Sequence, residues 1–220
     1  MKFEQFATKL TFELKKELPG FSAQNRMDPI GRKTANEYLN VNSSPKKSAV
    51  MILLYPEIHT LSIQVVLIVR SENEKGNHSG QISFPGGGFD EMDLDLSATA
   101  LRETEEEIGV DRRAIKIIGE LSSLYIPVSN YLVHPFVGIC NHKPVFQKNI
   151  LEVDDLLEVE INEFLLVRNK ASSDIFLKLM KRTMNVPCYN IRGKIIWGAT
   201  AMIISEFSEV IRRIKNPTSF

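Results

Sequence analysis

Apolar positions alternate between helical and strand spacing along the chain, and this alternation predicts the order of its elements. Near the amino terminus, apolar residues recur every three or four positions from Phe3 to Leu18, which predicts an amphipathic helix ending at Pro19-Gly20. Runs dense in Val, Ile and Leu predict buried strands at residues 49–55, 61–70, 115–121, 131–140 and 191–197. Helical spacing returns at 94–108 and at about 199–214, and a short segment lies near 159–167.

These strands and helices do not follow a strict strand–helix–strand alternation. The order therefore favours an α/β fold with a mixed sheet between helical layers over a doubly wound parallel sheet. A chain of 220 residues is long enough for one decorated domain and short for two. We expect residues 46–220 to form that domain, with residues 1–45 as an N-terminal helix and extension packed on it.

Composition excludes several classes of partner. Lys plus Arg and Asp plus Glu both total 27, so no overall field attracts nucleic acid or an anionic membrane. No segment reaches the length of a membrane span, and the first 18 residues lack the apolar core of a signal peptide. The two cysteines, Cys140 and Cys188, match no zinc-binding spacing. A reduced cytoplasmic protein fits these features best.

Candidate chemistry gathers in the helix predicted at 94–108. On a helical wheel Glu106 and Glu107 lie within roughly 60° of Glu103, opposite an apolar face formed by Leu94, Ala98, Leu101 and Ile108. Like charges four residues apart destabilise a helix, and a hard divalent cation such as Mg²⁺ or Mn²⁺ would compensate them. The alternative is an acidic face that is merely solvated.

A glycine-rich turn precedes this helix. Phe84-Pro85 leads into Gly86, Gly87 and Gly88, where the backbone can turn sharply and approach a ligand closely. Taken alone, such a stretch is usually only a turn. Asp93 or Asp95 is the candidate N-cap of the following helix, and Gly109 ends it.

Turn and helix together resemble the Nudix box, a glycine and a spacer followed by Arg-Glu-hydrophobic-x-Glu-Glu-x-Gly-hydrophobic. The residues in matching positions are Arg102, Glu103, Glu106, Glu107, Gly109 and Val110. Two departures occur, because Thr104 stands at the apolar position and Leu94 replaces the glutamate expected six residues after Gly88. Asp93 and Glu91 are the candidates to replace that glutamate as the partner of the box arginine.

The resemblance implies an α/β/α sandwich that hydrolyses a diphosphate with the help of Mg²⁺ or Mn²⁺. Its metal ligands carry over to Glu103, Glu106 and Glu107. Glu107 and Glu106 are the candidate catalytic bases, and Glu152 or Asp154 on a downstream loop remains an alternative. Dimers are common in the wider family, so a homodimer is possible.

Segments outside the box resemble the coenzyme A pyrophosphatase branch. They include Leu18-Pro19-Gly20 with Gln24, Arg70-Ser71, His78-Ser79-Gly80-Gln81, Val133-His134-Pro135 and Trp197-Gly198-Ala199-Thr200. The resemblance implies cleavage of coenzyme A or acyl-CoA to 3′-phosphoadenosine 5′-phosphate and (acyl-)4′-phosphopantetheine. The expected substrate-binding residues are Arg70, Lys75, His78, Gly86, Gly87 and Gly88. Lys75 occupies a loop where this branch usually has an arginine, which leaves the substrate open.

Three other functions remain compatible with the sequence. The first is the same hydrolysis of another nucleoside diphosphate derivative, such as a dinucleotide or a nucleotide sugar. A non-catalytic nucleotide-binding protein is the second, although a pure binder needs no clustered carboxylates. The third is a structural protein whose acidic helix is solvated.

Overall fold

The computed structural model describes residues 1–29, 44–71, 80–177 and 181–215. Its helices and 3₁₀ turns are α1 (Phe3–Glu13), α2 (Gly20–Gln24), η1 (Asn25–Met27), α4 (Leu96–Ile108), η2 (Arg112–Ala114), η3 (Ile161–Leu165), η4 (Val167–Asn169) and α5 (Gly198–Lys215). Its strands are β1 (Lys46–Pro56), β2 (Ile63–Arg70), β3 (Ile82–Ser83), β4 (Gly86–Gly88), β5 (Lys116–Glu120), β6 (Leu124–Ile126), β7 (Tyr131–Ile139), β8 (Val153–Glu160), β9 (Lys170–Leu177), β10 (Arg182–Ile191) and β11 (Lys194–Trp197).

The main sheet is mixed, as the sequence predicted. Its strands run in the order β3-β2-β1-β7-β5, with β4 also paired to β1, β6 to β7 and β8 to β2. The pairing of β1 with β7 is parallel, and the other pairings of this sheet are antiparallel. The long apolar run of β1 suits this central place, because seven consecutive residues from Ala49 to Tyr55 include six that are buried.

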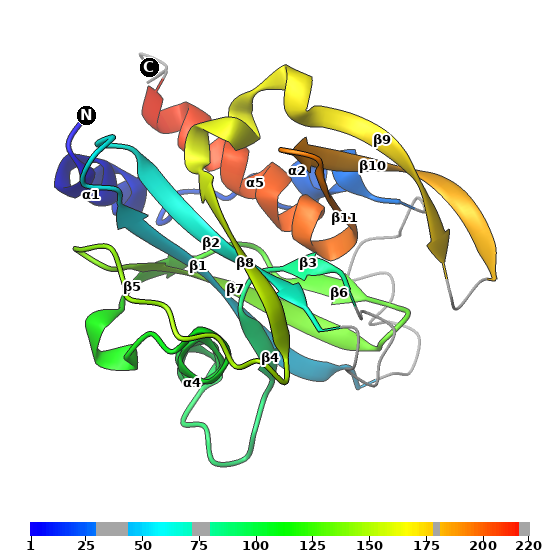
Figure 1. The fold of residues 1–220 in the computed structure, drawn as a ribbon, viewed down its shortest axis with the longest axis horizontal. Helices are drawn as coiled ribbons and strands as arrows, with labels where there is room; N and C mark the ends of the chain where they lie inside the picture. Colours follow the sequence, from blue (N-terminus) through cyan, green and yellow to red (C-terminus); the bar gives the residue numbers. More distant parts are fainter. Residues whose placement is uncertain (30–43, 72–79, 178–180, 216–220) are drawn as a thin grey trace.

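Helices cover both faces of this sheet (Figure 1). One face packs on α1 and α5 through a core that includes Leu10, Ile52 and Phe207. The other face packs on α4 through a smaller core that includes Met51 and Ala100. This layering confirms the predicted α/β/α sandwich and places the carboxylate helix on the face opposite α1 and α5.

The N-terminal helix is present but shorter than predicted. α1 ends at Glu13, and Leu14 is buried against Gly119 rather than continuing the helix to Leu18. The chain then forms the short helix α2, which was not predicted. Buried Glu206 of α5 anchors this segment, since its carboxylate accepts hydrogen bonds from the Gly20 N–H (3.0 Å) and from the Gln24 side chain (2.8 Å).

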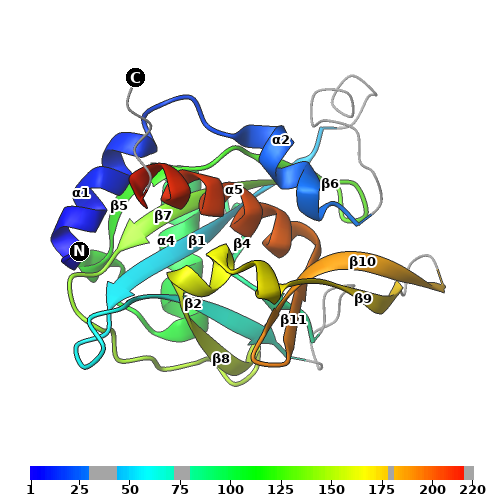
Figure 2. The same cartoon turned by 90° about the horizontal axis from the view of Figure 1, so that it is seen from above.

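A second sheet, with strand order β11-β10-β9, lies beside α5 and extends away from the main sheet as a long hairpin (Figure 2). The sequence predicted one strand over 191–197, where the structure has the end of β10, a turn and β11. The final helix matches its predicted limits to within a residue. No helix in the described part of the chain is long and apolar enough to cross a membrane.

Candidate active site

Strand β4 brings the glycine turn onto the centre of the main sheet. Gly86 and Gly87 pair with Val50 and Ala49 of β1. A β-carbon on Gly86 would lie 2.3 Å from the Ala49 carbonyl oxygen, so no side chain fits there. The sequence predicted a turn, and the structure shows that the glycines allow a strand to lie flat against β1 beneath the carboxylate helix.

Helix α4 begins and ends as predicted. Asp95 is its N-cap and accepts a hydrogen bond from the Ala98 N–H (2.9 Å), while Gly109 ends it in the left-handed conformation with a φ of 71°. These two residues set where α4 begins and ends, and therefore where its carboxylates lie along β4.

The predicted apolar face of α4 was only partly right, because Ile108 is buried and Leu101 packs against the same core, whereas Leu94 and Ala98 are not buried. The residues buried on the sheet are Thr99, Ala100, Thr104, Glu107 and Ile108, whereas Leu94 precedes the helix and is 96% exposed. The helix is therefore rotated so that Glu107 faces the sheet instead of standing opposite it. Glu105, the remaining glutamate of this acidic run, is paired near the surface with Arg112 (2.5 Å).

Glu107 is the most deeply buried carboxylate of the helix. It is 2% exposed, and its Oε2 accepts a hydrogen bond from the Gly86 N–H at 2.8 Å. Burial raises the pKa of Glu107 to about 8, against the lowering effects of the Gly86 hydrogen bond and of Arg70. An ionised carboxylate at this position needs further positive charge.

Glu103 lies directly against the next glycine. A β-carbon on Gly87 would come within 2.4 Å of its carboxyl carbon and Oε1, so the carboxylate occupies the space that a side chain there would fill. Burial raises the pKa of Glu103 despite its contact with Arg102, and the charges of Glu106 and Glu152 add to that shift. Gly86 thus binds the Glu107 carboxylate through its N–H, and Gly87 leaves the space that the Glu103 carboxylate fills.

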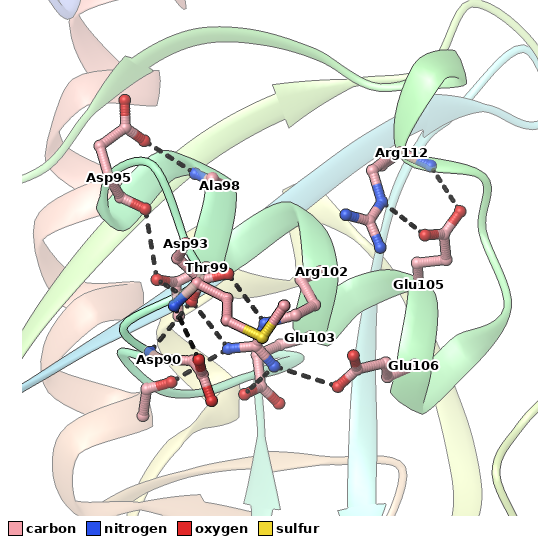
Figure 3. A network of polar contacts seen from close by, with 12 residues as sticks. Asp90, Asp93, Asp95, Ala98, Thr99, Arg102, Glu103, Glu105, Glu106 and Arg112 are labelled. Atoms are coloured by element: carbon pink, nitrogen blue, oxygen red, sulfur yellow. Dashed lines mark hydrogen bonds and ion pairs between the residues drawn. The ribbon is translucent and has the colours of Figure 1, made fainter.

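Arg102 organises the acidic side chains around it (Figure 3). Its guanidinium donates to both carboxylate oxygens of Asp93 at 2.9 Å, to Glu103 at 2.8 Å and to Glu106 at 3.0 Å. It also donates to the Gly88 carbonyl at 3.1 Å. Glu106 is the outermost member, with a side chain that is 51% exposed.

Of the two candidates to replace the missing box glutamate, the structure selects Asp93. Besides its bidentate contact with Arg102, Asp93 accepts hydrogen bonds from the Thr99 hydroxyl (2.8 Å) and the Asp90 N–H (3.1 Å). The guanidinium of Arg102 is the chief cause that holds the pKa of Asp93 well below its usual range. Glu91 has no hydrogen bond to Arg102 among the contacts of the described residues.

Arg70 lies at the edge of the same site. Its Nη1 is 3.7 Å from Oε1 of Glu107, and its side chain is 21% exposed. The register between β2 and β8 shifts between Val69 and Arg70, and such irregularities redirect side chains near functional sites. Lys75 and His78, also predicted to bind substrate, lie outside the described residues.

Glu152 joins the site from a downstream loop. Its backbone carbonyl accepts a hydrogen bond from the Ser71 N–H (2.8 Å), beside Arg70, and its charge acts on both Glu103 and Glu107. The sequence suggested Glu152 or Asp154 only as an alternative base to Glu107 and Glu106, because a single loop carboxylate carries no periodic signal.

The donor chemistry of this site fits a hard divalent cation. Glu103 and Glu107 offer oxygen atoms only, and both are disfavoured as anions by burial, a penalty that a cation would offset. However, among the described residues no three Asp, Glu, His or Cys side chains lie close enough together to hold a metal ion in their present arrangement. The carboxylates of Glu103 and Glu106 are instead hydrogen-bonded to the guanidinium of Arg102. A bound cation would have to share these carboxylates with Arg102 or displace it.

Comparison with known proteins identifies the family. A model of the NUDIX domain matches residues 45–173, which is more than half of the chain. The chain is 30% identical over 178 residues to the uncharacterized Nudix hydrolase NudL of Yersinia pestis, covering 81% of this chain and 85% of the relative.

Solved structures share the fold at lower identity. A MutT/nudix family protein from Enterococcus faecalis has a TM-score of 0.52 at 14% identity, covering 84% of this chain and 72% of that protein. The Nudix hydrolase RenU from M. smegmatis has a TM-score of 0.50 at 12% identity, covering 77% and 88%. These two structures share the fold, and the match to the NUDIX domain together with the 30% identity to NudL shows that the chain belongs to the Nudix hydrolase family.

Proposed function

We propose that this chain hydrolyses the diphosphate linkage of a nucleoside diphosphate derivative in a reaction that depends on Mg²⁺ or Mn²⁺. The observation that carries the proposal is the placement of Glu107 and Glu103 on the glycine strand. A protein that used α4 only as a solvated acidic helix would gain nothing from burying Glu107 to 2% exposure.

The carboxylates of α4 have two roles in the proposed reaction, metal binding and proton transfer. Glu103, Glu106 and Glu107 would hold the cation, which when bound neutralises diphosphate oxygens and lowers the pKa of water. Glu107 or Glu106 accepts the proton of the attacking water. Glu152 remains the alternative base.

The cationic side chains orient the other groups. Arg102 keeps Glu103 and Glu106 in place through its contact with Asp93. Arg70 is within reach of the site and can bind a phosphate oxygen pair through its planar guanidinium. Lys75 and His78 remain proposed substrate contacts from the sequence alone.

We further propose coenzyme A or an acyl-CoA as the substrate, which gives 3′-phosphoadenosine 5′-phosphate and (acyl-)4′-phosphopantetheine. The support is the resemblance of segments outside the box to the coenzyme A pyrophosphatase branch. Gly20 and Gln24 of that resemblance both donate hydrogen bonds to Glu206 and so take part in the packing of α2 on α5.

A substrate panel tests the proposal. Purified protein with Mg²⁺ or Mn²⁺ is incubated with coenzyme A, NADH, ADP-ribose and a diadenosine polyphosphate, and the products are separated by chromatography. We expect release of 3′-phosphoadenosine 5′-phosphate from coenzyme A. Preferential cleavage of another compound would contradict the proposed substrate and leave the proposed reaction standing. Binding without any cleavage would favour a non-catalytic nucleotide-binding protein.

A further inference from the structure

Three cationic side chains gather around one carboxylate near the carboxyl end of α5, and the proposed chemistry uses none of them. Glu209 pairs with Arg212 of the same helix (2.7 Å) and with Arg26 of η1. Lys170, the first residue of β9, lies close enough for its charge to interact with all three. Three positive charges and one negative charge leave the cluster with a net charge of +2.

The ammonium of Lys170 has no anionic partner of its own. Among the described residues, no carboxylate lies within ion-pair distance of it, although the side chain is half-buried. Burial lowers the pKa of Lys170 and Arg212 lowers it further, against the raising effect of Glu209. An additional anion at this place would offset both unfavourable effects on the ammonium.

Two buried hydroxyls lie beside the cluster. Tyr189 and Ser208 are fully buried, and neither hydroxyl oxygen has a hydrogen-bond partner among the described residues. Tyr189 pairs with Lys170 across β9 and β10, so both side chains lie on the same face of the small sheet. Ser208 precedes Arg212 by one turn of α5. Burial raises the pKa of Tyr189, and Ser208 and the charge of Arg212 lower it, which places the three side chains near one another.

The cluster is separate from the carboxylates of α4 and open to solvent. α5 packs on the face of the main sheet opposite α4, and β9 lies beside α5 (Figure 2). The side chains of Arg26 and Arg212 are 54% and 33% exposed. A soluble ligand can therefore reach these cations without entering the proposed diphosphate site.

We infer that Arg26, Lys170 and Arg212 form a second anion-binding site, which takes the phosphate group of a small soluble molecule. Charge and donor number select this ligand. A phosphate group carries about −1.5 to −2 charges at pH 7 and three strong acceptor oxygens, which match the net charge of +2 and the several donors. A single carboxylate brings one charge and two oxygens. The hydroxyls of Tyr189 and Ser208 become further donors when the long Lys170 side chain moves toward the anion.

The test measures the binding of inorganic phosphate and of adenosine 5′-monophosphate by calorimetry at pH 8, without a divalent ion. We expect Lys170→Met to weaken Kd for both ligands about tenfold, because it removes a charge-assisted contact and keeps an apolar stem. Lys170→Arg should retain binding. Arg113→Gln is the control, since Arg113 is 86% exposed and pairs with Asp111 elsewhere on the surface. Each protein is measured with and without Arg70→Gln, which removes the phosphate contact proposed at the active site.

A loss confined to Lys170→Met, in both backgrounds, supports the inference. Similar Kd values for the two ligands would identify phosphate itself as the ligand, and tighter binding of the nucleotide would identify a phosphate ester. An unchanged Kd in Lys170→Met, an equal loss in Arg113→Gln, or binding that Arg70→Gln abolishes would overturn the site. Binding of a poly-glutamate peptide without binding of phosphate would also overturn it, and would show a docking surface for an acidic protein instead. Absence of binding by all of these anions has the same consequence.

Discussion

The carboxylate of Glu103 occupies the place of a side chain at Gly87, with Oε1 2.4 Å from where a β-carbon would stand. Gly87→Ala should therefore displace Glu103 and lower kcat about a hundredfold, since a shift of about 1 Å in a catalytic group has effects of that order. The measurement is the initial rate of hydrolysis with Mg²⁺, with circular dichroism as the check of folding.

Gly88→Ala is the comparison for that variant. A β-carbon at Gly88 would meet its nearest neighbour, the Tyr131 hydroxyl, at an ordinary 3.6 Å. We expect a loss at least about tenfold smaller than for Gly87→Ala, because Glu103 would not be displaced. Equal losses would show that the contact between Gly87 and Glu103 is not what matters.

Asp93 should affect the reaction through Arg102. Asp93→Asn removes the charge that both 2.9 Å hydrogen bonds of Arg102 engage, and we expect activity to fall by about 10- to 100-fold. Leu94→Glu in the same variant supplies a carboxylate at the position where the Nudix box has its glutamate, and should restore part of the rate. Normal kcat in Asp93→Asn would contradict the positioning role of this pair.

Addition of metal should stabilise the folded protein. At a hundredfold excess over Kd, Mg²⁺ or Mn²⁺ that binds only the folded state contributes about 2.7 kcal/mol. For a chain of this size, that raises Tm by roughly 5–10 °C in a thermal scan. Chelator should reverse the shift, and Glu103→Gln should abolish it. The same rise in Tm for Glu103→Gln would place the metal elsewhere.

Glu206 should stabilise the fold without taking part in catalysis. Glu206→Gln turns an acceptor into a donor toward the Gln24 side chain and leaves a buried group unsatisfied, so unfolding free energy should fall by about 1–3 kcal/mol in urea. Glu209→Gln on the same helix is the control, since Glu209 pairs with Arg26 and Arg212 near the surface. Equal stability of the two variants would refute the anchoring role.

The sequence predicted most of the sheet because its central strands are continuous apolar runs. β8 was missed, since Asp154, Asp155 and Glu158 break up its apolar residues and its pairing with β2 is a long-range contact. β9 and most of β10 were missed for a similar reason, because polar residues interrupt the apolar ones along both strands, and the pairing of the two strands does not show in the local pattern.

The candidate site residues could be predicted from the residue types at the positions of the Nudix box, but their arrangement in space could not. Helical periodicity placed Ile108 and Leu101 correctly on the buried side of α4, but it missed Glu107 because Leu94 was counted within the helix and Glu107 was assumed to avoid the core. The hydrogen bond from Gly86 explains how a carboxylate can occupy that place. Only the three-dimensional structure could decide between Asp93 and Glu91, since both are close enough in sequence to reach Arg102.

The central claim is that carboxylates of α4 held on β4 carry out metal-dependent hydrolysis of a diphosphate. The most direct test is the rate of coenzyme A cleavage with Mg²⁺ by Glu107→Gln and by Glu105→Gln, its surface control on the same helix. We predict a fall of about 10²- to 10⁴-fold in kcat for Glu107→Gln with the fold intact, and near-normal turnover for Glu105→Gln. Near-normal turnover by Glu107→Gln would contradict this account of the site.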